Sequence, residues 1–175
     1  LPVVKHIPGH GRTPLDSHVS LPVVEAPRAA LVEQDFAPFK ALADLPLGMT
    51  AHIIYSDIDP DLPATLSMEM LRVVRQEIGF NGALMTDDLS MHALSGPFAE
   101  RAASAIEAGC DLALHCNGDP EEMSAVIDGT PRLEGESLAR TEAALAARGA
   151  LSPVPIDLPS ALQQIEDLAR GVPIA

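Results

Sequence analysis

Residues 1–18, LPVVKHIPGHGRTPLDSH, begin with an apolar run and continue into a stretch dense in ionisable side chains. Residues 1–4 have the composition of a short β-strand. Pro8, Gly9 and Gly11 then exclude both a helix and an extended ladder, so we expect a long loop leaving the strand. Three His, one Lys, one Arg and one Asp follow the strand. Folds of the α/β class place binding and catalytic groups there, which predicts a functional site.

The closest pair of ionisable groups in this loop is Asp16 and His18, two residues apart. If the backbone turns at Ser17, the carboxylate can bond one imidazole nitrogen and fix the tautomer. The other nitrogen is then left to exchange a proton with a substrate. Spacing alone favours the alternative, an Asp or Ser that caps a turn beside an exposed His.

Length and composition indicate one domain over residues 1–175 with an aliphatic core. Hydrophobic residues make up 47% of the chain, aromatic residues only 3%, and 175 residues suffice for a buried core. The net charge of −14 repels phosphate backbones and anionic membranes, so neither nucleic acid nor membrane is an expected partner.

A cytoplasmic location is expected, since the sequence opens with no signal-peptide pattern and has no apolar run of membrane-spanning length. Cys110 and Cys116 flank the apolar run DLALH. If that run is a strand, their Cα atoms lie roughly 20 Å apart and cannot form a disulfide. Two thiols fit a reducing compartment. The first residue is Leu1, already in a predicted strand, so we also expect the chain to start within a longer protein.

The pattern along the chain is a repeated strand followed by a helix. Strands are expected at 1–4, 48–54, 82–86 and 111–115, and helices at 28–44, 68–78, 98–108, 120–127, 134–148 and 160–170, the last two separated by a linker around Pro153 and Pro155. Ser67 and Asp119 are expected helix N-caps, and Gly79, Gly109 and Gly129 expected stops. Four such units indicate parallel strands with right-handed crossovers.

Polar residues follow the carboxyl ends of all four strands: Lys5-His6, His52, Asp87-Asp88 and His115-Asn117. In a parallel barrel or sheet these ends meet on one face, which predicts an enzyme. A metal hydrolase using His6, His10, His18 or His52 with Asp87 lacks a recognisable ligand motif. A phosphate site on the Gly9 and Gly11 amides lacks a Gly-rich turn opening a helix. A glycosidase needs a carboxylate nucleophile and a proton donor, which Asp87 and the Asp16-His18 pair supply.

Three blocks of sequence carry a family resemblance. They are KHIPGHGRTPLDSH (5–18), MTAHI (49–53) and IGFNGALMTDDLSM (78–91). In this order they resemble the family 3 glycoside hydrolases, in particular bacterial β-N-acetylhexosaminidases that recycle peptidoglycan. Ile7 stands where that family usually has Phe, a conservative change.

The resemblance implies a role for each residue in the blocks. Asp87 would be the nucleophile, His18 the general acid/base and Asp16 its orienting partner, while Lys5 and His6 would bind the sugar hydroxyls. The implied reaction is retaining hydrolysis of terminal β-linked N-acetylglucosamine from anhydromuropeptides. It implies neither a cofactor nor a metal. The residues themselves favour structural roles for the remaining acid, Asp88, and for His10, His92 and His115. His52 is either a wall of the cleft or a hydrogen-bonded group in the core.

A count of strands completes the expectations for the fold. A (β/α)8 barrel typically takes about 250 residues, whereas this chain supplies four strand-helix units, interpreted as the C-terminal half of a TIM barrel with extra C-terminal helices. Four strands leave open edges and a bare inner face. We therefore expect pairing with a second copy or with the absent N-terminal half. A non-catalytic half-barrel that binds sugar or a partner is the alternative from another class.

Overall fold

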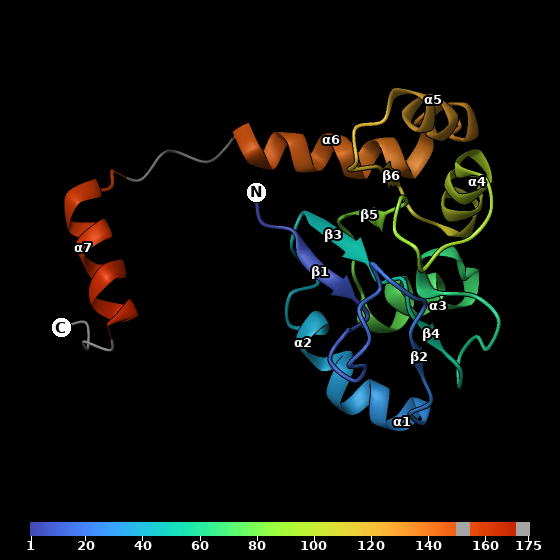
Figure 1. Ribbon diagram of the computed structural model, residues 1–175, viewed down its shortest axis with the longest axis horizontal. Helices are drawn as coiled ribbons and strands as arrows, with labels where there is room; N and C mark the ends of the chain where they lie inside the picture. Colours follow the sequence, from blue (N-terminus) through green and yellow to red (C-terminus); the bar gives the residue numbers. More distant parts are fainter. Residues whose placement is uncertain (150–154, 171–175) are drawn as a thin grey trace.

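Four parallel strands form the main sheet of the computed structural model, in the order β1-β3-β5-β6 (Figure 1). The structure describes residues 1–149 and 155–170. A second sheet pairs two short parallel strands, β2 and β4. In chain order the elements are β1 (Val4–Ile7), β2 (Val23–Val24), α1 (Arg28–Ala30), η1 (Leu31–Asp35), α2 (Ala37–Lys40), β3 (Leu47–Thr50), β4 (Ile54–Tyr55), η2 (Ala64–Leu66), α3 (Met68–Val73), η3 (Val74–Ile78), β5 (Ala83–Asp88), α4 (Phe98–Ala108), β6 (Leu112–Leu114), α5 (Pro120–Gly129), α6 (Gly135–Gly149) and α7 (Leu158–Ala169).

The two faces of the main sheet differ in burial. Gly48, Leu84 and Thr86 point to the helix-covered face and are buried, whereas Met49 and Met85, paired in register, are only half-buried on the other face. The core on the covered face is mostly aliphatic, as the composition predicts, with a few aromatic rings within it. The opposite face, the inner face of a barrel, has less cover.

Most predicted helix boundaries that rest on caps are confirmed, but the predicted stop at Gly129 is wrong. The α5 helix includes Gly129, where a Cβ atom would clash with the Ala99 backbone, and Thr130 is the C-cap. The α4 helix has the predicted bounds, 98–108. Ser67 caps α3 by accepting a hydrogen bond from the Met70 amide at 3.0 Å, and Asp119 caps α5. Gly79 ends η3 in a left-handed conformation, φ 81°, which L-residues with a side chain rarely adopt.

Three predicted segments need correction. The first strand spans Val4–Ile7 instead of 1–4, so Lys5 and His6 lie in the strand and not in the loop. The reason is that Val4 and Ile7 are the buried residues that pair with β3.

The predicted helix 28–44 is broken into α1, η1 and α2, with turns beyond α2, because Pro38 cannot donate a backbone hydrogen bond to continue the helix. The predicted strand 48–54 is divided between the two sheets. β3 ends at Thr50 and β4 begins at Ile54, which pairs with Val23. Of the linker predicted around Pro153 and Pro155, Pro153 lies outside the described residues.

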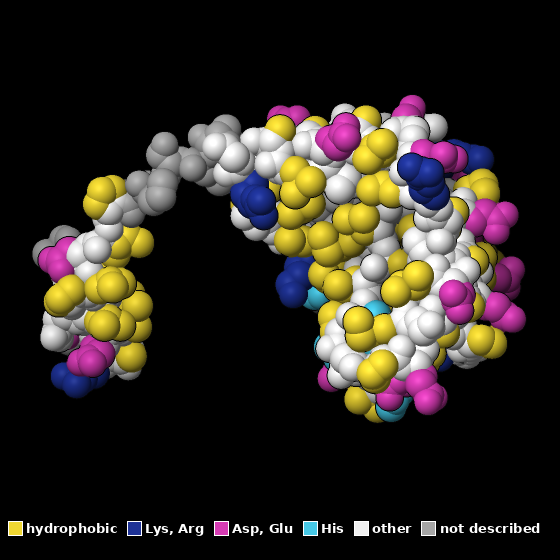
Figure 2. Space-filling view, turned by 90° about the horizontal axis from the view of Figure 1, so that it is seen from above, with side chains coloured by type: hydrophobic (Ala, Val, Ile, Leu, Met, Phe, Trp, Pro, Cys, Tyr) yellow, Lys and Arg dark blue, Asp and Glu magenta, His cyan; other side chains and the backbone are white. Residues whose placement is uncertain are grey.

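The α6 helix lies at the end of the molecule where the strands begin (Figure 1). Beyond it, α7 buries no residue, and its Leu158, Leu162, Ile165 and Leu168 are all more than half exposed. Figure 2 shows hydrophobic side chains gathered on α7. Within the described part of the chain, no helix combines the length and apolar character needed to cross a membrane.

Candidate active site

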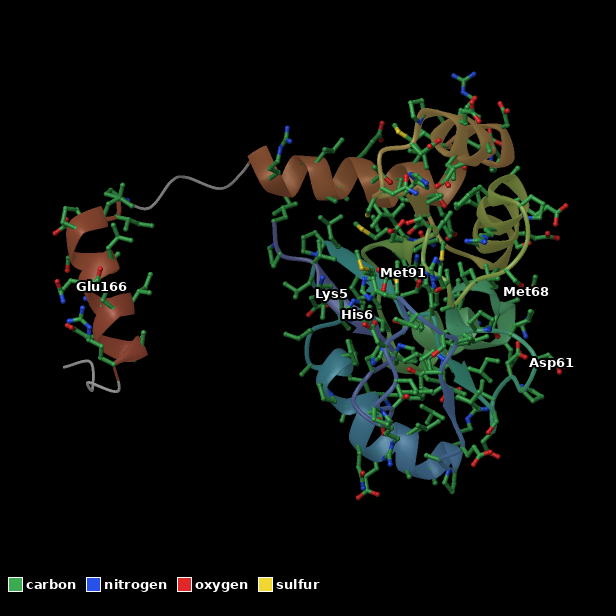
Figure 3. The ribbon with its side chains drawn as sticks, viewed as in Figure 1. Lys5, His6, Asp61, Met68, Met91 and Glu166 are labelled. Atoms are coloured by element: carbon green, nitrogen blue, oxygen red, sulfur yellow. The ribbon has the colours of Figure 1, made fainter. Side chains whose placement is uncertain are left out.

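His6 and Asp87 meet across the uncovered face of the sheet. His6 lies on β1, beside Lys5 (Figure 3), and Asp87 lies near the end of β5, with β3 between the two strands. The His6 Nε2 atom is 3.5 Å from Asp87 Oδ2, and the side chains are 30% and 13% exposed. Burial lowers the pKa of His6 below its usual value, although the nearby Asp87 opposes this effect. A largely shielded carboxylate therefore faces a neutral imidazole at neutral pH.

The two adjacent acids on β5 have different surroundings. Asp87 Oδ1 accepts a hydrogen bond from the Asp88 amide at 2.9 Å. The Asp88 carboxylate instead accepts three, from Ser90 N at 3.0 Å, Ser90 Oγ at 2.6 Å and Cys116 N at 3.0 Å. Burial alone would raise the pKa of Asp88, but these hydrogen bonds outweigh it and lower the pKa. Asp88 is occupied by the turn that it caps, as predicted, while Asp87 is the acid on the uncovered side.

The predicted pair in the first loop is formed. His18 Nδ1 lies 2.8 Å from Asp16 Oδ1, and the same oxygen accepts the His18 backbone amide at 2.9 Å. These two hydrogen bonds lower the pKa of Asp16, and the bond from the His18 backbone amide has the larger effect. Because Nδ1 holds Asp16, Nε2 is the nitrogen left for a substrate oxygen. Both side chains are strongly exposed, His18 at 74% and Asp16 at 66%, so the dyad lies at the rim of the site and not inside it.

Contacts at both ends of the loop hold it over the sheet. Arg12 bonds Asp35 Oδ2 at 2.7 Å and Gln34 Oε1 at 2.9 Å, and the Tyr55 hydroxyl donates to the Gly9 carbonyl. At the far end, the His18 carbonyl accepts the His92 amide at 3.3 Å. His92 belongs to the segment that follows β5. The dyad is thereby tied to the same part of the molecule as Asp87.

Most of the remaining imidazoles have structural contacts. His10 Nε2 lies 3.3 Å from Ser17 Oγ and braces the loop, as predicted. His115 Nε2 bonds Glu122 Oε2 at 2.9 Å, linking the end of β6 to α5. His52 is fully buried and hydrogen-bonded on both ring nitrogens, so it is a satisfied interior group and not a wall of the cleft.

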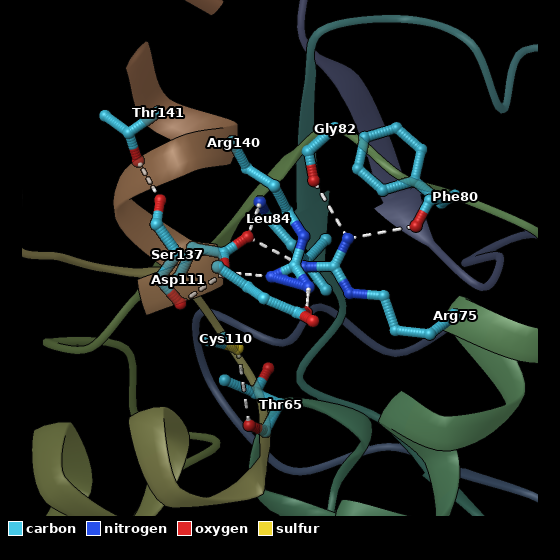
Figure 4. A network of polar contacts seen from close by, with 11 residues as sticks. Thr65, Arg75, Phe80, Gly82, Leu84, Cys110, Asp111, Ser137, Arg140 and Thr141 are labelled. Atoms are coloured by element: carbon cyan, nitrogen blue, oxygen red, sulfur yellow. Dashed lines mark hydrogen bonds and ion pairs between the residues drawn. The ribbon is translucent and has the colours of Figure 1, made fainter. Parts of the chain in front are cut away.

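A buried ionic network lies at the opposite end of the strands, where sequence reasoning expected nothing (Figure 4). Asp111, 4% exposed, precedes β6 and accepts hydrogen bonds from four donors. They are Arg75 Nη2 at 2.7 Å, Leu84 N at 2.8 Å, Ser137 Oγ at 2.7 Å and Arg140 Nη1 at 2.9 Å. The network fastens α6 to the start of β5 and β6. The only indication of this network in the sequence was an acidic residue, Asp111, immediately before an apolar strand.

The geometry does not favour the metal site considered from the sequence. Across residues 1–149 and 155–170 no three His, Cys, Asp or Glu side chains come together in a way that could hold a metal ion. The two cysteines are both free thiols, with Cys110 buried and Cys116 exposed. A shielded carboxylate with an imidazole beside it, near the carboxyl end of a parallel strand, and a separate exposed carboxylate-imidazole pair are groups that can exchange protons with a bound ligand.

The chain belongs to glycosyl hydrolase family 3. The model of that family's N-terminal domain, a TIM-barrel-like α/β fold, matches residues 1–145. The chain is 48% identical over 134 residues to a β-hexosaminidase of Alkalilimnicola ehrlichii, an alignment that covers 74% of this chain and 38% of that protein.

Solved structures agree with this assignment. A family 3 β-N-acetylglucosaminidase from Paenibacillus sp. str. FPU-7 superposes with a TM-score of 0.76 at 34% identity, covering 89% of this chain and 33% of that one. NagZ from Neisseria gonorrhoeae in complex with N-trifluoroacetyl-D-glucosamine gives a TM-score of 0.70 at 34% identity, covering 81% and 41%. The chain thus spans less than half the length of these proteins, and its fold is that of part of a (β/α)8 barrel.

Proposed function

We propose that this chain contributes the catalytic residues of a retaining glycoside hydrolase that releases terminal β-linked N-acetylglucosamine. The observation that supports this most directly is the position of Asp87. It is the acid at the end of β5 that faces the uncovered side of the sheet, 3.5 Å from His6, while its neighbour Asp88 is bonded into a turn. Membership of family 3 supports the same reaction class.

The proposed reaction has two steps. His18, protonated on Nε2 and held by Asp16, gives that proton to the glycosidic oxygen while Asp87 attacks the anomeric carbon. The bond to the leaving group breaks and a covalent glycosyl-enzyme forms. His18, now neutral, takes a proton from water, whose oxygen displaces Asp87 and restores the original configuration. No cofactor takes part.

The exposure of the dyad adds a requirement to this mechanism. The side chains of His18 and Asp16 are 74% and 66% exposed, whereas that of Asp87 is 13% exposed. We therefore propose that the loop moves inward over a bound sugar, which brings His18 to the leaving oxygen and excludes water.

The sugar is proposed to bind through Lys5 and His6. Both lie on β1, and His6 lies 3.5 Å from Asp87; an ammonium and an imidazole can bond hydroxyl groups. The glucosamine derivative bound by the Neisseria gonorrhoeae protein supports N-acetylglucosamine as the sugar. We propose fragments of peptidoglycan, the anhydromuropeptides, as substrates. The two free thiols are compatible with action in the cytoplasm.

We further propose that residues 1–175 form a single unit, the C-terminal half of a TIM-barrel domain, that works together with four more βα units. Among the described residues, β1 and β6 each have a neighbouring strand on one side only. A groove of about 540 Å³ borders β6, lined by Leu112, Ala113, Val126 and Ile127 among others. The relatives are more than twice as long as the matched segment. The completing units are proposed to be the absent half of the barrel or, in its place, a second copy.

A fluorogenic N-acetyl-β-glucosaminide tests the proposal. The chain is assayed alone and coexpressed with the part of the Alkalilimnicola ehrlichii relative outside the aligned segment, with light scattering to give the mass of each assembly. We expect the completed assembly to turn over faster than the chain alone. In that assembly Asp87→Asn should reduce kcat/KM by at least about 10³-fold.

Asp88→Asn is the matched control and should remain within about tenfold of wild type, because an amide oxygen still accepts hydrogen bonds in the turn. Equal losses in the two variants would contradict the assignment of the nucleophile. Sugar binding without turnover by any assembly would favour the non-catalytic half-barrel. A fully active monomer of 18.4 kDa would refute the need for a second half.

A further inference from the structure

His52 is a buried imidazole with no part in the proposed reaction, yet it contacts the segment that carries Asp87. It follows β3 and has no exposed surface. Its Nε2 atom lies 3.0 Å from the backbone carbonyl oxygen of Asp88, and its Nδ1 atom lies 2.7 Å from Thr65 Oγ1. Thr65 is itself fully buried and lies 2.8 Å from Thr50 Oγ1. The ring is therefore fixed on both sides inside the protein.

The partners of His52 determine its tautomer. A carbonyl oxygen can only accept, so Nε2 must carry a hydrogen and donate it to Asp88. Burial lowers the pKa of His52, which keeps the ring neutral and leaves Nδ1 as an acceptor. Thr65 Oγ1 lies 2.7 Å from Nδ1 and 2.8 Å from Thr50 Oγ1, and it also donates to the Ala51 carbonyl oxygen at 3.1 Å. These contacts hold the ring so that its Nε2–H group points at the Asp88 carbonyl oxygen.

Asp88 is consequently held at each of its polar groups. Its carbonyl accepts from His52 and also from the Met91 amide at 3.1 Å. Its carboxylate is held by Ser90 and Cys116. The group that remains is its own N–H, which donates to Asp87 Oδ1 at 2.9 Å. Rotation of Asp88 would break that bond and release the Asp87 carboxylate from its orientation.

We propose that His52 is a positioning residue that orients Asp87 for attack by fixing the backbone of Asp88. The proposal rests on the function proposed above, because it takes Asp87 as the nucleophile. His52 has no exposed surface with which to contact a sugar, its hydrogen-bond partners are Thr65 and the Asp88 carbonyl, and it acts through that carbonyl. Misplacement of a reacting group by about 1 Å can cost 10²-fold in rate, so the effect of losing this contact should appear in kcat and not in KM.

Two substitutions separate the contacts of the ring. In His52→Gln, the longer side chain places an amide N–H near the position of Nε2 and keeps the donor to Asp88. In His52→Asn, the shorter side chain keeps a polar partner for Thr65 but does not reach Asp88. We expect His52→Asn to lower kcat of the completed assembly by about 10²-fold with KM little changed, and His52→Gln to recover most of it. Glu121→Gln, a substitution of an exposed side chain on α5, should have no effect.

Hydrogen exchange of backbone amides in the chain itself gives a readout that needs no turnover. The Asp88 amide, bonded to Asp87, should exchange about tenfold faster in His52→Asn than in wild type or His52→Gln, while the Leu84 amide, bonded to Asp111 at the other end of β5, reports overall stability. The proposal would be overturned if amide exchange in His52→Asn accelerated equally at Asp88 and Leu84. It would also be overturned if the Asp88 amide exchanged at the same rate in His52→Gln and His52→Asn. If Asp87→Asn stays active, the proposed nucleophile is wrong, and the exchange data still decide whether His52 holds Asp88.

Discussion

Replacing Asp111 by Ala should remove the most strongly connected buried carboxylate of the structure. Asp111 is 4% exposed and accepts hydrogen bonds from Arg75, Leu84, Ser137 and Arg140. The substitution leaves two guanidinium groups, 18% and 23% exposed, without this carboxylate. Breaking a buried pair from one side costs about 3–5 kcal/mol of the free energy of unfolding. At about 2–4 °C per kcal/mol for a chain of this size, Tm should fall by about 6–20 °C.

Urea and thermal unfolding followed by circular dichroism measure this effect. The matched control is Glu136→Ala, which removes a different carboxylate from the same Arg140 side chain. Glu136 is 88% exposed, and exposed pairs contribute about 0–1 kcal/mol. If Asp111→Ala were no more destabilising than Glu136→Ala, the network would not be what fastens α6 to the sheet.

Three further outcomes are expected. A Cβ atom at Gly82 would lie 2.4 Å from the Leu45 carbonyl oxygen. Gly82→Ala should therefore lower the midpoint of urea unfolding by an amount corresponding to about 1–3 kcal/mol. Gly11 has open space around it, so Gly11→Ala should leave the midpoint unchanged. Burial alone would raise the pKa of Asp111, but its four hydrogen-bond donors outweigh this effect and lower the pKa in the folded state. The contribution of Asp111 to stability is therefore complete above the unfolded pKa of about 3.9 and is lost as pH falls through the lower folded pKa. The free energy of unfolding should then fall less steeply with decreasing pH in Asp111→Asn than in the wild type, and identical slopes would refute this. In the completed assembly His18→Ala should slow natural disaccharides more than aryl glycosides, whose leaving group departs without a proton, and added azide should partly restore the rate; a uniform loss would indicate a structural His18.

Local signals in the sequence were sufficient for features formed by neighbouring residues. The α4 helix was predicted with its observed bounds, and Gly109, which follows it, adopts a positive φ. The Asp16-His18 pair needs only a turn at Ser17, and it is formed. The approach of His6 to Asp87 joins residues far apart in sequence, and it was reached only through the rule that parallel strands end on one face.

Features that depend on distant partners were missed. Residues 48–54 read as one apolar strand, yet Ile54 leaves the main sheet because Val23 offers a second pairing that no local pattern reveals. The same limit explains the ionic network of Asp111, whose partners Arg75 and Arg140 lie 36 and 29 residues away. The two roles considered for His52 could not be separated until the contacts with Thr65 and Asp88 were known.

The two thiols differ enough to make one of them a selective chemical handle. Burial raises the pKa of Cys110 to about 12, which leaves it unreactive at neutral pH. Partial burial, followed by the charges of Asp88 and Asp87, also raises the pKa of Cys116, but Cys116 is exposed and Cys110 is not. The Cys116 backbone amide donates to the Asp88 carboxylate, so Cys116 lies next to the turn that Asp88 caps. A maleimide fluorophore or spin label on the unmodified sequence would therefore attach at a single point on the rim of the site. It would report changes at the turn that Asp88 caps, without a cysteine-free background having to be engineered.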